Sequence, residues 1–466
     1  MRRLLATLLL LSASAAWAQA QTAPAPTAAP ADTETLSIPF ERYKLDNGLE
    51  VIMSVDRKIP VVAVNLWYHV GAYHEQPGRT GFAHLFEHMM FQGSQHVADD
   101  QHIGMLEKLG ATSLNGTTNF DRTNYFQTVP SNHLETALWL ESDRMGFLLP
   151  AMTEEKLRTQ KEVVKNERRQ GVETAPYGLA YERFWQALFP APHPYYGRVI
   201  GSMKDLEAAT MEDVTGFFKV WYRPSNATLA VVGDFDVEEA KQLIEKYFGS
   251  IPSGEKPQAP EVAPASLNAP EQIAFEETIG NLPMVMMGWH TPAMYADGDA
   301  EASVLGVVLS QGRSSRLYKR LVFEKELAQS VSAYQQSLGA QSVFVISAMA
   351  RPGVTAETLQ KEIDAVLEEV RTQGVTEDEV QRVRNRLQTS ALSGLQRVGG
   401  FGGKADTLQE YNHFLGDPGR LAWDMARYNA VTPEMVQQAA QKLDANRVVL
   451  IAKPKAPAAA ATQEVK

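Results

Sequence analysis

Two short segments of this 466-residue chain recur at almost the same distance, and this repeat constrains the fold more than any other feature. Residues 152–157, Met-Thr-Glu-Glu-Lys-Leu, are matched by Val-Thr-Glu-Asp-Glu-Val at 375–380, an offset of 223. Residues 209–214, Ala-Thr-Met-Glu-Asp-Val, are matched by Val-Thr-Pro-Glu-Met-Val at 431–436, an offset of 222. A nearly constant offset indicates an internal duplication. We therefore predict two homologous halves.

Each half shows patterns of both strands and helices. Residues 43–53 alternate around Asn47-Gly48, a strong signal for a β-hairpin. Residues 61–71 predict a buried strand, and residues 133–148 have apolar side chains at helical spacing. The fold class is therefore α+β, and we expect each half to be an antiparallel-type sheet with helices packed on one face.

Composition divides the chain into six parts. A charged start, an apolar run and the small residues Ala18 and Ala20 predict a secretory signal peptide that is cleaved after one of those alanines. The stretches rich in Pro and Ala are typical of linkers. The predicted parts are a signal peptide at 1–20, a flexible linker at 21–35, an N-terminal domain at 36–250, an interdomain linker at 251–272, a C-terminal domain at 273–454, and a disordered tail at 455–466.

The predicted leader places the mature protein outside the cytoplasm, with a Gram-negative periplasm as the expected compartment. No later stretch is apolar for long enough to predict an integral membrane segment.

The chain has no Cys, so a metal site must use histidine and carboxylate ligands. Removing Arg2 and Arg3 changes the formal charge from −11 to −13, which argues against nucleic acid as a partner.

Residues 80–91, Thr-Gly-Phe-Ala-His-Leu-Phe-Glu-His-Met-Met-Phe, place His84 and His88 four positions apart with Glu87 between them. On a helix these three side chains share one face. Neutral imidazole binds zinc well, and catalytic zinc sites use three protein ligands and one open position. Glu87 would then take a proton from the attacking water and pass it to the leaving amine. The alternative is an amphipathic core helix whose histidines are only hydrogen-bonded.

A third ligand should come from another element that faces this helix. The predicted helix at 153–170 offers several glutamates, and its apolar face decides among them. Glu167 lies on the side of Val163 and Val164, whereas Glu162 is about 140° away around the helix. We therefore choose Glu167, with a solvent-exposed helix glutamate as the alternative.

Two segments also carry a family resemblance. Residues 81–94, Gly-Phe-Ala-His-Leu-Phe-Glu-His-Met-Met-Phe-Gln-Gly-Ser, and residues 160–169, Gln-Lys-Glu-Val-Val-Lys-Asn-Glu-Arg-Arg, resemble the pitrilysin/insulinase family of zinc peptidases. Within that family, whose metal motif is H-x-x-E-H, the chain is similar to the short branch that includes the mitochondrial processing peptidase. The resemblance implies one zinc ion per chain, held by His84, His88 and Glu167, with Glu87 as the general base.

The resemblance also implies how substrate and metal are supported. Asn115 and Gly116 fall where the family has an edge strand that pairs with the substrate backbone, although a simple turn explains the same pair. Seven residues before the metal-binding glutamate, related enzymes carry a second glutamate that supports the metal site. Gln160 stands at that position here, and it can donate and accept hydrogen bonds without carrying a charge.

A second departure concerns the oxyanion of the reaction. Active family members use an Arg and a Tyr from a C-terminal half, but this chain has Val322 and Gln329 at those places. Arg316 and Tyr318 are nearby and out of register, and they are the candidates within this chain for the missing substrate-binding groups.

We therefore expect a zinc-dependent endopeptidase that hydrolyses peptides or unfolded polypeptide segments in a closed chamber formed by two chains. The expected partner is a homologous subunit without the metal motif that supplies the Arg and Tyr. One alternative is a self-sufficient homodimer. Another is a non-catalytic peptide-binding or assembly subunit, because fold alone does not define activity.

Overall fold

The computed structural model describes residues 36–455. The predicted signal peptide at 1–20, the linker at 21–35 and residues 456–466 of the predicted tail lie outside the described residues. Within the described range, no helix combines the length and apolar character needed to cross a membrane.

The first half contains a six-stranded sheet in the order β1-β2-β6-β3-β5-β4. Its strands are β1 Glu41–Lys44, β2 Glu50–Val55, β3 Val61–Tyr68, β4 Thr112–Thr118, β5 Thr123–Pro130 and β6 Ala227–Gly233. The predicted hairpin is confirmed, because β1 and β2 pair antiparallel on either side of Asn47-Gly48. The pair β2–β6 is parallel and the remaining neighbours are antiparallel.

The second half repeats this topology in a five-stranded sheet with the order β7-β11-β8-β10-β9. Its strands are β7 Glu271–Glu277, β8 Met284–Thr291, β9 Ala328–Gln336, β10 Ser342–Ala350 and β11 Val448–Pro454. Without β1, the two orders correspond strand for strand, and β7–β11 is again the parallel pair. The prediction of two homologous halves is confirmed.

The helices of the first half are α1 Phe82–Met89, α2 Gln101–Lys108, α3 Leu134–Phe147, α4 Glu154–Arg168, α5 Gly178–Leu188, α6 Met203–Ala208, α7 Met211–Trp221 and α8 Val237–Phe248. Those of the second half are α9 Asp299–Ser310, α10 Ala356–Gln373, α11 Glu377–Gly394, α12 Lys404–Leu415, α13 Leu421–Ala430 and α14 Pro433–Lys442. The repeated threonines in the sequence begin equivalent helices. Thr153 and Thr376 cap α4 and α11, while Thr210 and Thr432 cap α7 and α14.

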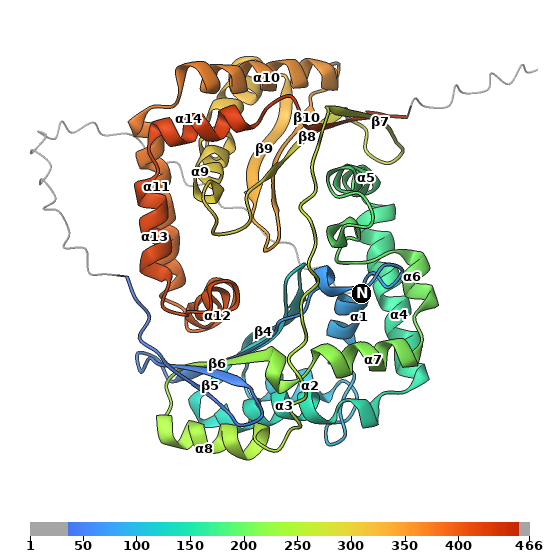
Figure 1. Ribbon diagram of the computed structural model, residues 1–466, viewed down its shortest axis with the longest axis vertical. Coiled ribbons are helices and arrows are strands. Elements are labelled where there is room, and N and C mark those ends of the chain that lie inside the picture. Colours follow the sequence, from blue (N-terminus) through green and yellow to red (C-terminus); the bar gives the residue numbers. More distant parts are fainter. Residues whose placement is uncertain (1–35, 456–466) are drawn as a thin grey trace, which may run out of the picture. The chain divides into compact units, whose positions relative to one another are not determined.

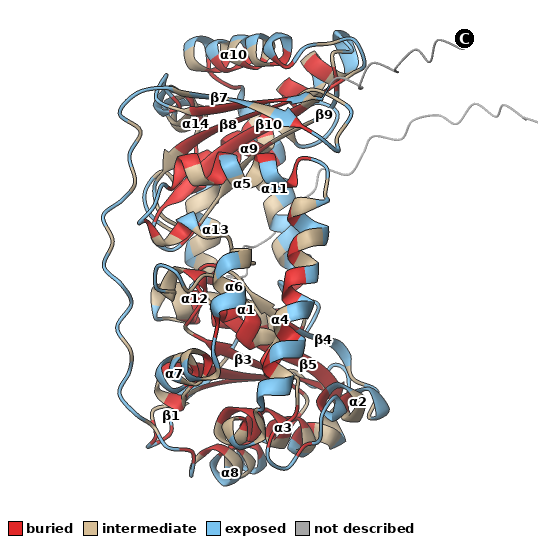
Figure 2. Cartoon of the chain, turned by 90° about the vertical axis from the view of Figure 1, so that its right-hand side faces the viewer, coloured by how far each residue is buried: buried red, intermediate tan, exposed pale blue. Residues whose placement is uncertain are grey.

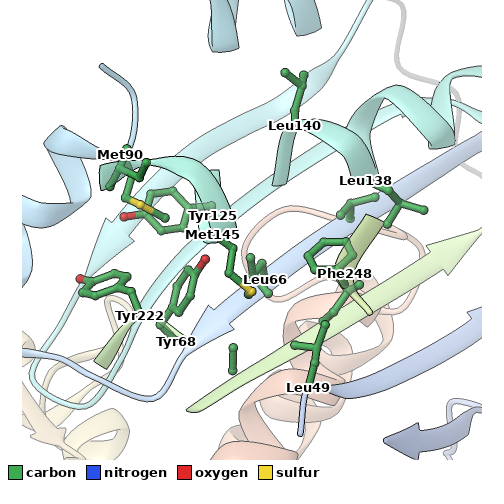
Figure 3. Packing of buried hydrophobic residues seen from close by; sticks show 14 of the residues in the cluster. Leu49, Leu66, Tyr68, Met90, Tyr125, Leu138, Leu140, Met145, Tyr222 and Phe248 are labelled. Atoms are coloured by element: carbon green, nitrogen blue, oxygen red, sulfur yellow. The ribbon is translucent and has the colours of Figure 1, made fainter. Parts of the chain in front are cut away.

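One face of the first sheet packs against helices to form the core that supports α1. Leu66 and Tyr68 of β3 meet Leu138 and Met145 of α3 in this core (Figure 3). Tyr222, which follows α7, belongs to the same cluster. Burial of this apolar surface is the main favourable contribution to stability. It also fixes the position of α1 relative to the sheet.

Each sheet receives a helix from the other half on its second face, in addition to the expected helices on its own side. The helix α5 packs on β7, β8 and β11, and α12 packs on β3 and β6 (Figure 1). The side-chain amide of Gln409 on α12 donates to the carbonyl oxygens of Asn65 (2.8 Å) and Thr228 (2.7 Å). This reciprocal exchange holds the two halves together.

The two halves are joined by a long segment without helix or strand. It runs from the end of α8 at Phe248 to the start of β7 at Glu271, two residues before the predicted start of the C-terminal domain at 273. Most of its residues are exposed or half-buried (Figure 2). Its many Pro residues lack the N–H group that a sheet needs, which is consistent with this irregular path.

Candidate metal centre

The helix α1 buries one side and presents the other to a cavity. Phe82, Leu85, Phe86 and Met89 form its buried side at the spacing i, i+3, i+4 and i+7. The side chains at 84, 87 and 88 therefore point elsewhere, and those of His84 and Glu87 line the cavity. Because the apolar side of the helix must be buried, the polar side chains on its other side face the cavity.

The N-terminus of α1 is held by a carboxylate from the preceding loop. Oε2 of Glu75 accepts a hydrogen bond from N of Gly81 (2.9 Å), and Oε1 accepts one from N of Ala83 (2.8 Å). These N–H groups have no partner within the helix, so a carboxylate here satisfies them. Gly81 has φ +88°, and an added Cβ would lie 2.9 Å from the backbone of Ile200 and Gly201. Both features fix the entry of the chain into α1.

The helix α4 brings Glu167 against α1. Its next residue, Arg168, forms a two-pronged ion pair with Glu182 of α5, at 2.8 Å and 3.0 Å. The same guanidinium donates to the carbonyl oxygen of Gly201 at 2.8 Å. Arg168 therefore ties the end of α4 to α5 and to the loop that contacts Gly81.

The structure brings His84, His88 and Glu167 together as one group of possible metal ligands, with one ligand atom of each within 4.8 Å of the others. Oε2 of Glu167 lies 3.7 Å from Nε2 of His84 and 3.4 Å from Nε2 of His88. Ligand atoms bound to one zinc ion at tetrahedral angles lie roughly 3.3–3.6 Å apart. Both carboxylate–imidazole distances are close to this spacing, and two imidazoles with a carboxylate are ligands that suit zinc.

Burial keeps His84 in the form that binds metal. Burial, and then the neighbouring His88, lower the pKa of His84 to about 4. The imidazole is therefore neutral at physiological pH, as a metal ligand must be. Within the described residues its Nδ1 atom is buried without a hydrogen-bond partner. The Glu167 side chain is 42% exposed, which leaves the group open on that side.

Glu87 is held beside these ligands by the edge strand β4. Oε2 of Glu87 accepts a hydrogen bond of 2.7 Å from Oγ1 of Thr118. Burial raises the pKa of Glu87 to about 7, although the bond from Thr118 acts in the opposite direction. A carboxyl group with a pKa near neutrality can both accept and return a proton at physiological pH. This is the behaviour required of a general base that later acts as an acid.

A cavity of about 640 Å³ opens beside His84 and Glu87. It is lined on one side by Gly116, Thr117 and Thr118 of β4, and on another by Tyr334 and Gln336 of β9. Both strands lie at the edges of their sheets. A cavity of this size lies within the range of ligand pockets.

The predicted pair Asn115-Gly116 lies within strand β4 rather than in a turn, with Gly116 opposite Tyr125. Gly116 lines the cavity, and a Cβ there would come within 2.9 Å of the Phe91 ring. Asn115 is exposed and does not line the cavity.

Gln160 is buried on α4, on the same side of that helix as Glu167, which lies two turns further along.

The structure does not bring Arg316 or Tyr318 to the cavity of their own chain. Arg316 forms a two-pronged ion pair with Glu379, with both contacts at 2.8 Å, and Tyr318 begins a π-helical turn. Val322 packs against the second core, and Gln329 lines a different cavity. Neither Arg316 nor Tyr318 is therefore among the described residues that line the cavity beside Glu87.

Sequence reasoning missed Thr118 and Glu75. Thr118 could have been found from the alternation of side chains along a strand. It lies two residues after Gly116 and therefore on the same side of β4. Glu75 is six residues before Gly81 in an irregular loop, where no periodicity relates it to the helix.

A helix carrying His-x-x-Glu-His and a glutamate from a second helix is the ligand arrangement of metallopeptidases with the inverted zinc motif. Two family signatures agree with this class. The signature described as "Insulinase (Peptidase family M16)" matches residues 50–187, and "Peptidase M16 inactive domain" matches residues 208–387.

The chain is 30% identical over 360 residues to the "Zinc protease PqqE" of Helicobacter pylori, covering 76% of this chain and 80% of that relative. It is 24% identical over 406 residues to the "Uncharacterized zinc protease YmxG" of Bacillus subtilis, covering 86% and 95% of the two chains. The chain therefore belongs to the insulinase family of peptidases, family M16.

Solved structures show the same fold. A protease from Helicobacter pylori superposes with a TM-score of 0.83 at 26% identity, covering 90% of this chain and all of that chain. The periplasmic protease PqqL from Escherichia coli superposes with a TM-score of 0.73 at 19% identity, covering 90% of this chain and 48% of PqqL. PqqL is thus about twice as long as the fold described here.

Proposed function

We propose that this chain is a zinc-dependent endopeptidase and the metal-bearing subunit of a two-chain enzyme. Its substrates are peptides or unfolded polypeptide segments, hydrolysed in a chamber that the two chains close. The convergence of His84, His88 and Glu167 beside a hydrogen-bonded Glu87 carries this proposal. Relatives described as zinc proteases support the metal and the reaction.

A bound zinc ion would polarise the scissile carbonyl and stabilise the charge that develops on its oxygen. The residues of this chain do the remaining work. Glu87 takes a proton from the attacking water and returns it to the leaving amine. The edge strand β4 offers unpaired backbone groups beside the cavity, so an extended peptide can add to the sheet there.

Two features support a second subunit. Val322 and Gln329 stand where the family resemblance calls for Arg and Tyr, and neither Arg316 nor Tyr318 is among the described residues lining the cavity beside Glu87. The chain also corresponds in fold to only 48% of PqqL, so a pair of such chains would match the full length of that protease. PqqL is described as periplasmic, and the predicted signal peptide at 1–20 would send this chain to the same compartment.

The direct test is peptide hydrolysis by the mature chain, alone and with the product of a neighbouring homologous gene. We expect cleavage of unstructured peptides, its loss in a zinc chelator and its return on adding zinc. A preparation with full zinc occupancy that binds peptides but cleaves none, with or without the partner, would favour the non-catalytic peptide-binding alternative.

We predict that His84→Ala and His88→Ala reduce the zinc retained after dialysis from about one ion per chain to below about a tenth, since two ligands cannot hold the ion against dialysis. Metal analysis of the purified proteins measures this. His133→Ala is the matched control, because His133 lies before α3 and outside the ligand group. Unchanged zinc in both variants would show that the ion binds elsewhere.

A further inference from the structure

The wall of the cavity beside Glu87 combines aromatic side chains with one cation. Arg198 is the one arginine or lysine among the described residues that line this cavity. The aromatic lining residues are Phe120, Tyr181, Phe184, Trp185 and Tyr334. The aromatic side chains beside this half-buried guanidinium carry no charge that could balance it.

The carboxylate of Glu182 near Arg198 is already paired with another arginine. Glu182 lies close enough to favour the charge of Arg198, but both of its oxygens are held by Arg168. Burial, and further the like charge of Arg168, lower the pKa of Arg198. A guanidinium nevertheless stays charged at any physiological pH. Among residues 36–455, Arg198 makes no ion pair and no side-chain hydrogen bond.

We propose that Arg198 binds a carboxylate of the peptide substrate next to the scissile bond. This inference rests on the proposed peptidase function and specifies its substrate class. The carboxylate is an Asp or Glu side chain near the cleaved bond, or the free C-terminus of the peptide.

Arg198 and Glu87 line the same cavity, so a peptide that places its scissile bond beside Glu87 can place a nearby carboxylate at Arg198. The aromatic walls accept the methylene groups of a Glu side chain or the apolar part of a C-terminal residue. A bond between guanidinium and carboxylate is charge-assisted and can be two-pronged, which makes it stronger than a hydrogen bond between neutral groups.

The first test compares kcat/KM for matched peptides at full zinc occupancy. One series has both ends blocked and carries Glu or Gln at each position flanking the cleaved bond. A second series carries only Gln and ends in a free or an amidated C-terminus. We expect a preference of about tenfold to a hundredfold for the carboxylate in one of the two series. The series that shows it identifies the source of the carboxylate.

The second test removes the cation. Arg198→Met should abolish the preference by lowering kcat/KM for the carboxylate peptides to the value for their uncharged partners, because the ion pair is lost. Arg198→Lys should recover part of the preference, since Lys keeps the charge without the two-pronged geometry. Arg183→Met is the matched control, because Arg183 is an exposed residue of α5 outside the cavity lining.

A binding measurement separates this inference from the proposed function. The zinc-loaded Glu87→Gln chain should bind the carboxylate peptide about tenfold or more tightly than its uncharged partner, and Arg198→Met in that background should remove the difference. If the unmodified chain cleaves no peptide, the proposed function is contradicted, but the difference in binding affinity between the two peptides still tests the role of Arg198. Equal affinity for both peptides, or a preference that survives Arg198→Met, would overturn the inference.

Discussion

Replacing Glu87 with Gln should leave zinc in place and lower turnover by about a hundredfold to ten-thousandfold, the usual contribution of a positioned general base. The amide of Gln keeps the shape of the side chain and can still accept the hydrogen bond from Thr118. It cannot accept a proton from water, however. Initial rates on an unstructured peptide, normalised to zinc content, measure the effect.

The substitution Glu162→Gln provides the matched control. Glu162 is an exposed glutamate of α4, with 56% of its side chain accessible, and it pairs with Lys165 outside the ligand group. It should keep zinc and turnover at the level of the unmodified chain. If Glu87→Gln remains within about tenfold of that level at equal zinc occupancy, the base is another group.

The local elements of the fold were predictable because their signals are local. Asn47-Gly48 specifies the hairpin β1–β2 through turn geometry alone, since Gly48 has φ +91°. The threonine caps of α4 and α11 stand at equivalent places in the two halves and therefore revealed the duplication. Such features depend on a few neighbouring residues and not on tertiary contacts.

The candidate site was predictable for a related reason. The three positions of His84, Glu87 and His88 are fixed by one helix, and the phase of a second helix selected Glu167 over Glu162. The contact between α1 and α4 was not available from periodicity, because the two helices are far apart in sequence. The family resemblance supplied that pairing, and the distances of 3.4 Å and 3.7 Å now describe it.

The exchange of α5 and α12 between halves could not be read from the sequence. Both helices have apolar residues that any sheet face could cover, so their patterns do not specify which half they join. The cavity wall depends on this exchange, since Tyr181 and Trp185 of α5 meet Tyr334 of β9 there. The aromatic surroundings of Arg198 are therefore a tertiary property.

The isolated chain should cleave peptides poorly and gain at least about tenfold in turnover when mixed with a homologous chain that lacks the metal motif and carries the Arg and Tyr. An oxyanion develops during hydrolysis, and each preorganised donor that is missing costs about a hundredfold to a thousandfold. Val322 and Gln329 cannot supply a guanidinium or a phenol. Turnover at increasing partner concentration measures the gain, which should saturate at one partner per chain.

The homodimer makes the opposite prediction, because Arg316 and Tyr318 would then act on the zinc site of a second copy. In that case Arg316→Ala and Tyr318→Phe would each remove most of the activity of the isolated chain. Arg316 also pairs with Glu379, so Glu379→Gln serves as the control for loss of that ion pair. If the isolated chain already matches the mixture, and only the first two variants are inactive, the complementary subunit is excluded and the homodimer is correct. If both variants retain activity and the partner raises it, the missing donors come from the partner.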